Sequence, residues 1–170
     1  MNRSSIGSPP KAPQLSNRER LAFFLERTLD RRLAWVGVAL YRLTRGHIAR
    51  LYGKDVLVLT TRGRRTGRKR TVLLQFFRAG TQMVLVAANS GLPTHPGWFY
   101  NLKATPTAQV QVLDHIFAVR AEEIAVDAAT TFWPRILQRS PDYARYFKRT
   151  SRTMPLVRLT PLAADDEALP

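Results

Sequence analysis

Short runs of β-branched and other apolar residues, separated by turn residues, occupy the middle of this 170-residue chain. Helical segments do not alternate with these runs, so they predict antiparallel strands rather than a doubly wound parallel sheet. The first three runs predict a meander, and the last two predict a hairpin that turns at Asp114-His115. The runs are Val56–Thr61, Arg70–Phe77, Gln82–Ala88, Ala108–Leu113 and Ile116–Ile124.

Helical patterns lie mainly at the two ends of the chain. Ser16 and Glu19 are spaced as a capping box, and the apolar spacing that follows predicts a long basic amphipathic helix that extends to Arg42. The other expected elements are short helices at Gly97–Lys103, from Asp127 into Leu137 and at Tyr143–Arg149, and a last strand at Pro155–Thr160. We therefore expect an α+β fold built on an antiparallel barrel, with one domain over residues 15–161 and flexible tails at 1–14 and 162–170.

The charge balance predicts an anionic partner. The chain has 27 Lys and Arg against 12 Asp and Glu, a formal net charge of +15. Nucleic acid, an anionic membrane and a phosphate- or carboxylate-bearing small molecule all fit that charge. Cysteine is absent, which favours a reducing, cytoplasmic location, and the longest apolar stretch, Leu33–Tyr41, is too short to span a bilayer. The basic amphipathic helix is expected either to cover the sheet or to lie on an anionic membrane.

Six basic residues crowd into one turn between the first two predicted strands, and we call residues 62–70 the arginine turn. Gly63 and Gly67 supply bends there, and guanidinium groups pair with phosphate or carboxylate oxygens through two hydrogen bonds at once. The spacing matches neither a phosphate-binding loop nor a dinucleotide-binding fingerprint. Taken alone, the turn fits either an anion site or a solvated hairpin tip. Its basic residues are Arg62, Arg64, Arg65, Arg68, Lys69 and Arg70.

Two ordered motifs carry a family resemblance. The segments VLVLTTRGRRTGRKR, from Val56, and LVAANSGLPTHPGWFYNLKATPTAQVQV, from Leu85, resemble the deazaflavin-dependent nitroreductase family, and the match extends from Tyr41 to Thr160. The resemblance implies a split β-barrel similar to that of flavin-mononucleotide oxidases. It also implies coenzyme F420 as cofactor, an 8-hydroxy-5-deazaflavin with a phospholactyl oligoglutamate tail. Hydride transfer from the reduced cofactor to a small organic acceptor is the implied activity, and it requires no metal.

The resemblance also assigns candidate site residues. It places the anionic tail on Arg64, Arg65, Thr66 and Arg70. Tyr143 and Tyr146 are the candidates to orient the acceptor or relay a proton. Trp98 is expected mainly in the core, and the three histidines, His47, His95 and His115, are expected to be structural or exposed. The ring is expected along Thr71, Val72, Leu73, Leu74 and Gln75, beside Val86, Ala87, Ala88 and Asn89, with Gly97, Trp98, Phe99, Tyr100 and Asn101 closing the other side.

Departures from the family pattern leave the acceptor open. Leu73, Gln75, Ala88 and Ser140 replace residues that are frequent at pocket positions in that family. Quinones are therefore the first expectation, with nitro compounds and activated enones behind them. Two other hypotheses remain at this point: a basic nucleic-acid-binding domain, and a related barrel that binds flavin mononucleotide, haem or lipid. The single phosphate of flavin mononucleotide would leave several of these arginines unpaired, which favours the deazaflavin.

Overall fold

A single antiparallel sheet forms the centre of the molecule. The structure, a computed structural model, describes residues 35–47 and 53–163. Within them seven strands pair in the order β2-β1-β5-β6-β7-β4-β3, and every pairing is antiparallel, which confirms the predicted α+β class. The strands are β1 (Val56–Arg62), β2 (Lys69–Gln75), β3 (Phe77–Ala79), β4 (Gln82–Val86), β5 (Thr107–Val112), β6 (His115–Glu123) and β7 (Leu156–Pro161).

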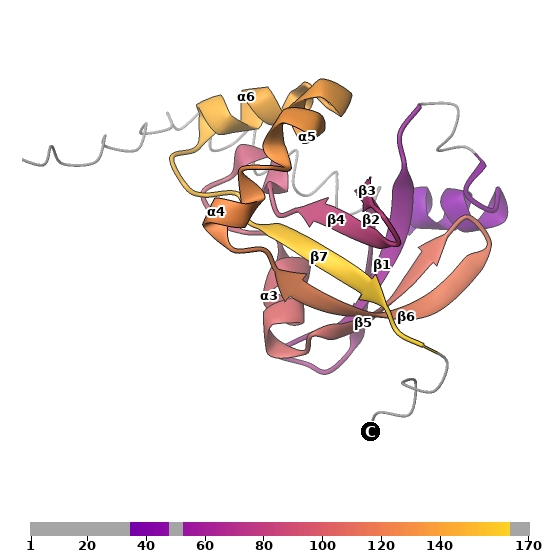
Figure 1. Cartoon of the computed structure of the whole chain (residues 1–170). Coiled ribbons are helices and arrows are strands. Elements are labelled where there is room, and N and C mark those ends of the chain that lie inside the picture. Colours follow the sequence, from indigo (N-terminus) through magenta and orange to yellow (C-terminus); the bar gives the residue numbers. More distant parts are fainter. Residues whose placement is uncertain (1–34, 48–52, 164–170) are drawn as a thin grey trace, which may run out of the picture.

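The two edges of this sheet are consecutive in the chain. Edge strands β2 and β3 are separated only by Phe76, whose backbone N–H donates to the Asp55 carbonyl at 2.9 Å. The edges must therefore meet at this corner, and Figure 1 shows the sheet strongly curled. The predicted meander is wrong in this respect: the run Arg70–Phe77 is divided between two strands, and β4 pairs with β7 instead of β2.

The curled sheet encloses the main core. The side chains of Leu57, Leu59, Val110, Val119 and Leu159 are fully buried in one cluster, to which Trp98, Phe99 and Leu102 are added by α3 (Gly97–Ala104). Because alternate residues of a strand face opposite sides, these positions fill the inner face.

Three further helices lie together at one end of the sheet (Figure 1). They are α4 (Val126–Ala129), α5 (Trp133–Arg139) and α6 (Asp142–Arg149), and they cover a second core cluster that contains Ile136, Tyr143 and Leu156. The helix predicted from Asp127 into Leu137 is two helices, because a turn at residues 130–132 interrupts it. A short 3-10 turn, η1 (Asn89–Gly91), contacts α6.

Residues 35–43 are helical and are anchored to the sheet by Tyr41. The Tyr41 hydroxyl donates to the Val56 carbonyl and accepts from the Leu113 N–H, each at 2.9 Å. Gly46 has φ +77°, and a Cβ there would lie 2.9 Å from the Tyr41 ring, so the Tyr41–Gly46 motif is a structural anchor. The rest of the expected long helix lies outside the described residues. Among the described residues, no helix combines the length and apolarity needed to cross a bilayer.

Candidate functional site

A cleft of about 960 Å³ lies beside the arginine turn. Three parts of the chain line it: the arginine turn with the start of β2, the loop from Asn89 to the start of α3, and one face of α6. The first contributes Thr61, Gly63, Arg64, Arg65, Thr66, Arg70, Thr71 and Val72. The others contribute Asn89, Ser90, Leu92, Thr94, His95, Pro96, Gly97, Trp98 and Asn101, and Arg145, Tyr146 and Arg149.

Backbone hydrogen bonds close the arginine turn. The N–H of Gly63 donates to the Arg68 carbonyl at 2.9 Å, and the N–H of Gly67 donates to the Gly63 carbonyl at 2.7 Å. Gly67 adopts φ +65°, which a side chain would strain. The compact backbone leaves the Arg64 and Arg65 side chains exposed, with the Arg64 guanidinium 4.5 Å from the centre of the Tyr100 ring.

Asn101 joins α3 to the arginine turn. Its Oδ1 accepts the Arg64 N–H at 3.2 Å, and its Nδ2 donates to the Thr61 hydroxyl at 3.0 Å. Thr61 in turn donates to the Arg70 carbonyl at 3.4 Å. Although Asn101 lines the cleft, both of its polar atoms bind the protein, so it positions the turn and is less free for a ligand than the sequence suggested.

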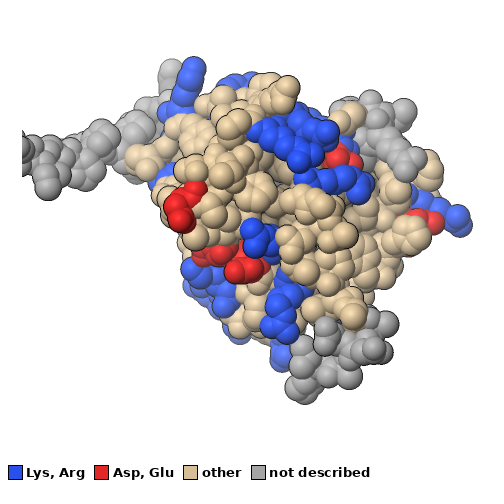
Figure 2. Space-filling model, in the orientation of Figure 1, with Lys and Arg blue, Asp and Glu red and all other residues tan. Residues whose placement is uncertain are grey.

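Positive charge is concentrated in the cleft. Five arginines line it, and no Asp or Glu is present in its described lining. On the face shown in Figure 2, basic side chains lie in several separate groups rather than one continuous stripe. The cleft lining, with five arginines and no acidic residue, presents an anion site. Its arginines are Arg64, Arg65 and Arg70 on one wall and Arg145 and Arg149 on the other.

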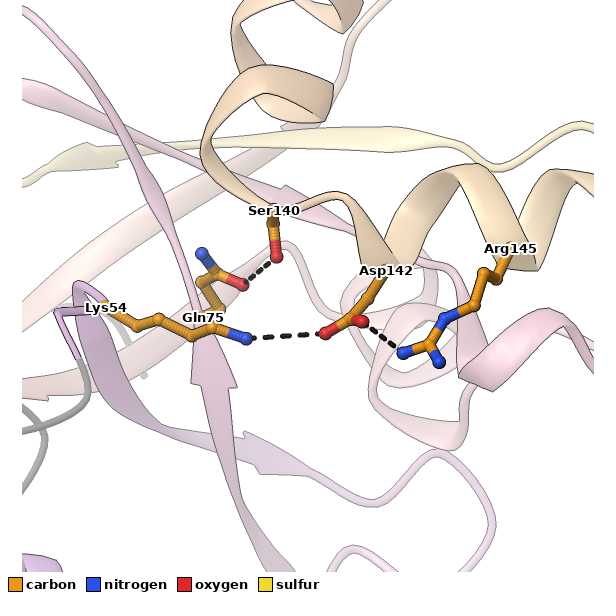
Figure 3. Close-up of polar contacts among 5 residues, drawn as sticks. All are labelled: Lys54, Gln75, Ser140, Asp142 and Arg145. Carbon is orange, nitrogen blue, oxygen red and sulfur yellow. Dashed lines mark hydrogen bonds and ion pairs between the residues drawn. The ribbon is translucent and has the colours of Figure 1, made fainter.

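The two α6 arginines were not predicted. Arg145 and Arg149 are four residues apart and share a helix face with Tyr146. This spacing is the only sequence signal that could have identified them. Arg145 is paired with Asp142, which also lies 3.5 Å from the Lys54 ammonium (Figure 3). The hydrogen bond from Arg145 lowers the pKa of Asp142.

Arg152 supports the loop wall from behind, and sequence reasoning missed it. Its Nε donates to the Leu92 carbonyl at 2.7 Å, and its Nη1 donates to the Ala87 carbonyl at 3.2 Å and contacts His95 Nδ1 at 2.9 Å. His95, expected to be structural or exposed, lines the cleft. Nothing in the sequence around Arg152 marks it as different from the other arginines.

The structure brings only part of the predicted site together. Tail candidates Arg64, Arg65, Thr66 and Arg70 line the cleft. Of the ring candidates, Thr71, Val72, Asn89, Gly97, Trp98 and Asn101 do so as well. Trp98 is also buried in the core, as expected. The ring candidates that do not line it are Leu73, Leu74, Gln75, Val86, Ala87, Ala88, Phe99 and Tyr100.

Side-chain packing explains why most of these ring candidates do not line the cleft. Leu73 packs against the cluster around Tyr41, and Leu74 packs against the main core, because neighbouring strand residues face opposite ways. Ala87 and Phe99 belong to the main core, with Tyr100 packed against it, and Val86 and Ala88 belong to the second cluster. These residues form the support behind the cleft rather than its surface.

Two departures from the family pattern contact each other. The Ser140 hydroxyl donates to Gln75 Oε1 at 3.0 Å, which links the end of β2 to the end of α5 (Figure 3). Ser140 is buried, and neither residue lines the cleft. Their hydrogen bond is therefore a packing feature of the wall behind the site.

The two candidate catalytic tyrosines lie in different environments. Tyr146 lines the cleft. Tyr143 is 9% exposed and packs between Phe77 and Tyr146, with ring centres 6.0 and 5.6 Å away, and it is not brought to the cleft. Burial strongly raises the pKa of Tyr143, so its hydroxyl stays protonated at neutral pH.

Comparison with known proteins identifies the family. The model of the F420H2-dependent quinone reductase family matches residues 34–161. An F420H2-dependent quinone reductase of Mycobacterium tuberculosis is 34% identical over 142 residues, which cover 81% of this chain and 95% of that protein. The solved structure of an F420-H2 dependent reductase, FDR-A, is 31% identical with a TM-score of 0.56, over 62% of this chain and 93% of that chain.

A more distant structure shows how widely the fold is used. HutZ, a heme storage protein from Vibrio cholerae, has a TM-score of 0.50 at 14% identity, over 65% of this chain and 84% of that chain, and this likeness concerns the fold alone. The curled antiparallel sheet is a split β-barrel, as predicted. Together the motifs, the fold and the matches show that the chain belongs to the F420H2-dependent quinone reductase family, a family of oxidoreductases whose cofactor is coenzyme F420.

Proposed function

We propose that this chain reduces a quinone with F420H2, binding the cofactor in the cleft beside the arginine turn. The observation that carries the proposal is the lining of that cleft, with five arginines and no acidic residue among the described residues. The family assignment supports the cofactor, and the names of the relatives favour quinones over nitro compounds and activated enones.

The donors of the cleft fit the tail of the cofactor. A phosphate followed by several carboxylates needs a series of charge-assisted donors, and arginine provides them as planar forks. We assign the tail to Arg64, Arg65, Thr66 and Arg70, the residues first proposed for it. Arg149, on the opposite wall, adds a cation for which no ion pair is found among the described residues.

The less polar end of the cleft fits the ring. Val72 and Trp98 offer apolar surface there, and a Cβ added to Gly97 would meet no atom within 4 Å, so this position leaves open space at the start of α3. We assign the deazaflavin ring to this end, with Thr71, Asn89 and Asn101 around it. The reduced cofactor supplies the hydride, while the protein positions the ring and limits the access of water.

Tyr146 is the better candidate to deliver a proton to the acceptor. A general acid must reach the reacting group, and of the two tyrosines only Tyr146 lines the cleft. We therefore assign Tyr143 the role of holding Tyr146 through the contact between their rings.

Steady-state oxidation of F420H2 with quinones, nitroaromatics and activated enones tests this function. We expect the highest kcat/KM with a quinone. Tyr146→Phe should lower kcat by about 10²–10⁴-fold without weakening F420 binding, the usual effect of losing a positioned acid. Tyr143→Phe is the matched control and should retain most of its turnover. Absence of F420H2 oxidation with every acceptor would contradict the function, and equal loss in both variants would contradict the role of Tyr146.

We also propose a cytoplasmic protein that binds anionic membranes peripherally through the helix at residues 35–43. Trp35 and Leu43 are 68% and 83% exposed, while Val38 and Tyr41 face the sheet, so the same helix has an outward apolar surface beside Arg42 and Arg45. Cosedimentation with anionic vesicles should fall with salt and in Trp35→Ser. Equal recovery with neutral and anionic vesicles would contradict this location.

A further inference from the structure

Arg152 is a half-buried cation that binds carbonyl groups instead of a carboxylate. No ion pair of Arg152 is found among residues 35–47 and 53–163. A guanidinium carries only donors, so every contact it makes requires an acceptor. Burial lowers the pKa of Arg152, yet an arginine remains charged throughout the range in which proteins fold. The carbonyls that accept from it belong to Ala87, Ala88, Leu92 and Thr153.

The contact between Arg152 and His95 determines where the histidine carries its proton. Arg152 Nη1 lies 2.9 Å from His95 Nδ1. Because the guanidinium can only donate, this contact is a hydrogen bond when Nδ1 accepts, and the ring proton then lies on Nε2. A second proton on Nδ1 would place two N–H groups against each other. The hydrogen bond thus favours the neutral ring with its proton on Nε2.

The groups around His95 mainly lower its pKa as well. Burial and the charge of Arg152 lower its pKa, with a smaller contribution from Lys103, whereas the Ala87 carbonyl and Glu123 act to raise it. The ring packs against Phe99 and Tyr100, with ring centres 5.1 and 6.0 Å away, which fixes its orientation. The Ala87 carbonyl also accepts from Arg152, which occupies one of its two lone pairs.

We propose that Arg152 is a positioning residue that holds His95 as a neutral Nε2–H donor to an oxygen atom of the bound deazaflavin cofactor. The ligand half of this inference rests on the proposed function, whereas the tautomer half does not. His95 lines the cleft between Thr94 and Pro96, on the wall that Arg152 fixes through the neighbouring carbonyls. A neutral imidazole N–H donates a hydrogen bond without releasing its proton, so His95 binds while Tyr146 remains the acid.

The tautomer is tested first, in the protein without cofactor. The chain contains three histidines, so ¹⁵N NMR of histidine-labelled protein, with His95→Gln for assignment, resolves each ring. We expect the neutral His95 ring to carry its proton on Nε2, and the lowered pKa of His95 to rise when Arg152 is replaced. In Arg152→Gln, His95 should therefore titrate at higher pH than in the wild type. A neutral wild-type ring with its proton on Nδ1, or identical titration of His95 in the wild type and in Arg152→Gln, would overturn the inference.

The ligand contact is tested by fluorescence titration with F420. A glutamine amide nitrogen reaches the position of Nε2, whereas an asparagine amide nitrogen reaches that of Nδ1. We expect His95→Gln to bind F420 nearly as tightly as the wild type and His95→Asn to bind about tenfold more weakly, the effect of one lost hydrogen bond to a polar or charged group. Matched His115→Gln and His115→Asn variants, outside the cleft, should both bind normally.

The outcomes separate this inference from the proposed function. If the wild type binds F420 and the two His95 variants bind it equally, His95 makes no such contact and the proposed function stands. If the wild type does not bind F420, both the function and the ligand contact fail, and the NMR measurement alone decides the role of Arg152 on the histidine.

Discussion

The exposed arginines of the arginine turn and the half-buried Arg152 serve different purposes. In the arginine turn, Arg64 and Arg65 are exposed, and their guanidinium groups have no hydrogen-bond acceptor among the described residues. Arg152 donates to four backbone carbonyls and to His95. Arg64 and Arg65 therefore leave their donors for a ligand, whereas Arg152 uses its donors to hold the cleft wall together.

This difference shows why net charge is a weak guide to function. Each of these arginines contributes one unit to the formal charge of +15, yet only exposed donors are available to an anion. Arg152, whose donors already bind the protein, acts on a ligand only indirectly, through the loop that it holds in place. Substitution of Arg64 or Arg65 should therefore change ligand binding alone, whereas substitution of Arg152 should lower stability as well.

Loss of Arg152 should have the largest effect on stability. Arg152→Met keeps the aliphatic part of the side chain but leaves the carbonyls of Ala87, Ala88 and Leu92 without this donor, which should lower the free energy of unfolding by about 2–4 kcal/mol. Urea denaturation measures this change in the free energy of unfolding. Arg135→Met, at an exposed position in α5, is the matched control and should change stability by less than about 0.5 kcal/mol. Equal stability of both variants would remove the structural role of Arg152.

Arg65→Ala should weaken cofactor binding and leave stability nearly unchanged. Because Arg65 is exposed and lines the cleft, its loss should weaken F420 binding by about 1.5–3 kcal/mol while the Tm barely changes. Fluorescence titration and thermal unfolding measure the two quantities, and Arg135→Ala serves as the control outside the cleft. Normal F420 binding together with a loss of affinity for duplex DNA would instead support the nucleic-acid hypothesis.

A smaller effect is expected in the pH dependence of stability. Burial and Arg152 lower the pKa of His95 below its ordinary value of 6.5, so the unfolded chain binds more protons than the folded protein in mildly acidic solution. This contribution to stability is present above pH 6.5 and is lost as pH falls through the lowered pKa. Wild-type protein should therefore lose more stability between pH 7 and 5 than His95→Gln does.

The pH experiment has an internal control. The matched control is His115→Gln, the same substitution at an exposed histidine outside the cleft. Asp142, whose pKa is also lowered from 3.8, titrates below this window. Parallel curves for wild type and His95→Gln would show that Arg152 does not act on the histidine.

Sequence reasoning succeeded where the information is local. The β-branched run at Val56–Thr61 matches β1 closely, and the glycines of the arginine turn mark a bend that backbone hydrogen bonds close. It failed where strand pairing is distant. Nothing within Arg70–Phe77 shows that the chain leaves one sheet edge after Gln75 and begins the other at Phe77.

The candidate site was predictable to a similar degree. The family motifs directed attention to Arg64, Arg65 and Thr66, which do line the cleft. The roles of Arg152 and His95 depend on contacts between residues more than fifty positions apart, which no local pattern encodes. The same holds for Tyr143 and Tyr146, whose neighbouring positions in one helix give one buried ring and one ring in the cleft.

The central claim is that the cleft recognises F420 through its anionic tail. Fluorescence titration of one protein sample with F420, with the deazaflavin lacking its phospholactyl oligoglutamate tail, and with flavin mononucleotide tests it most directly. We predict a Kd for F420 in the micromolar range or below and clearly weaker binding of the other two, because several charge-assisted pairs act together only with the full tail. Equal affinity for all three ligands, or tighter binding of flavin mononucleotide, would contradict the account.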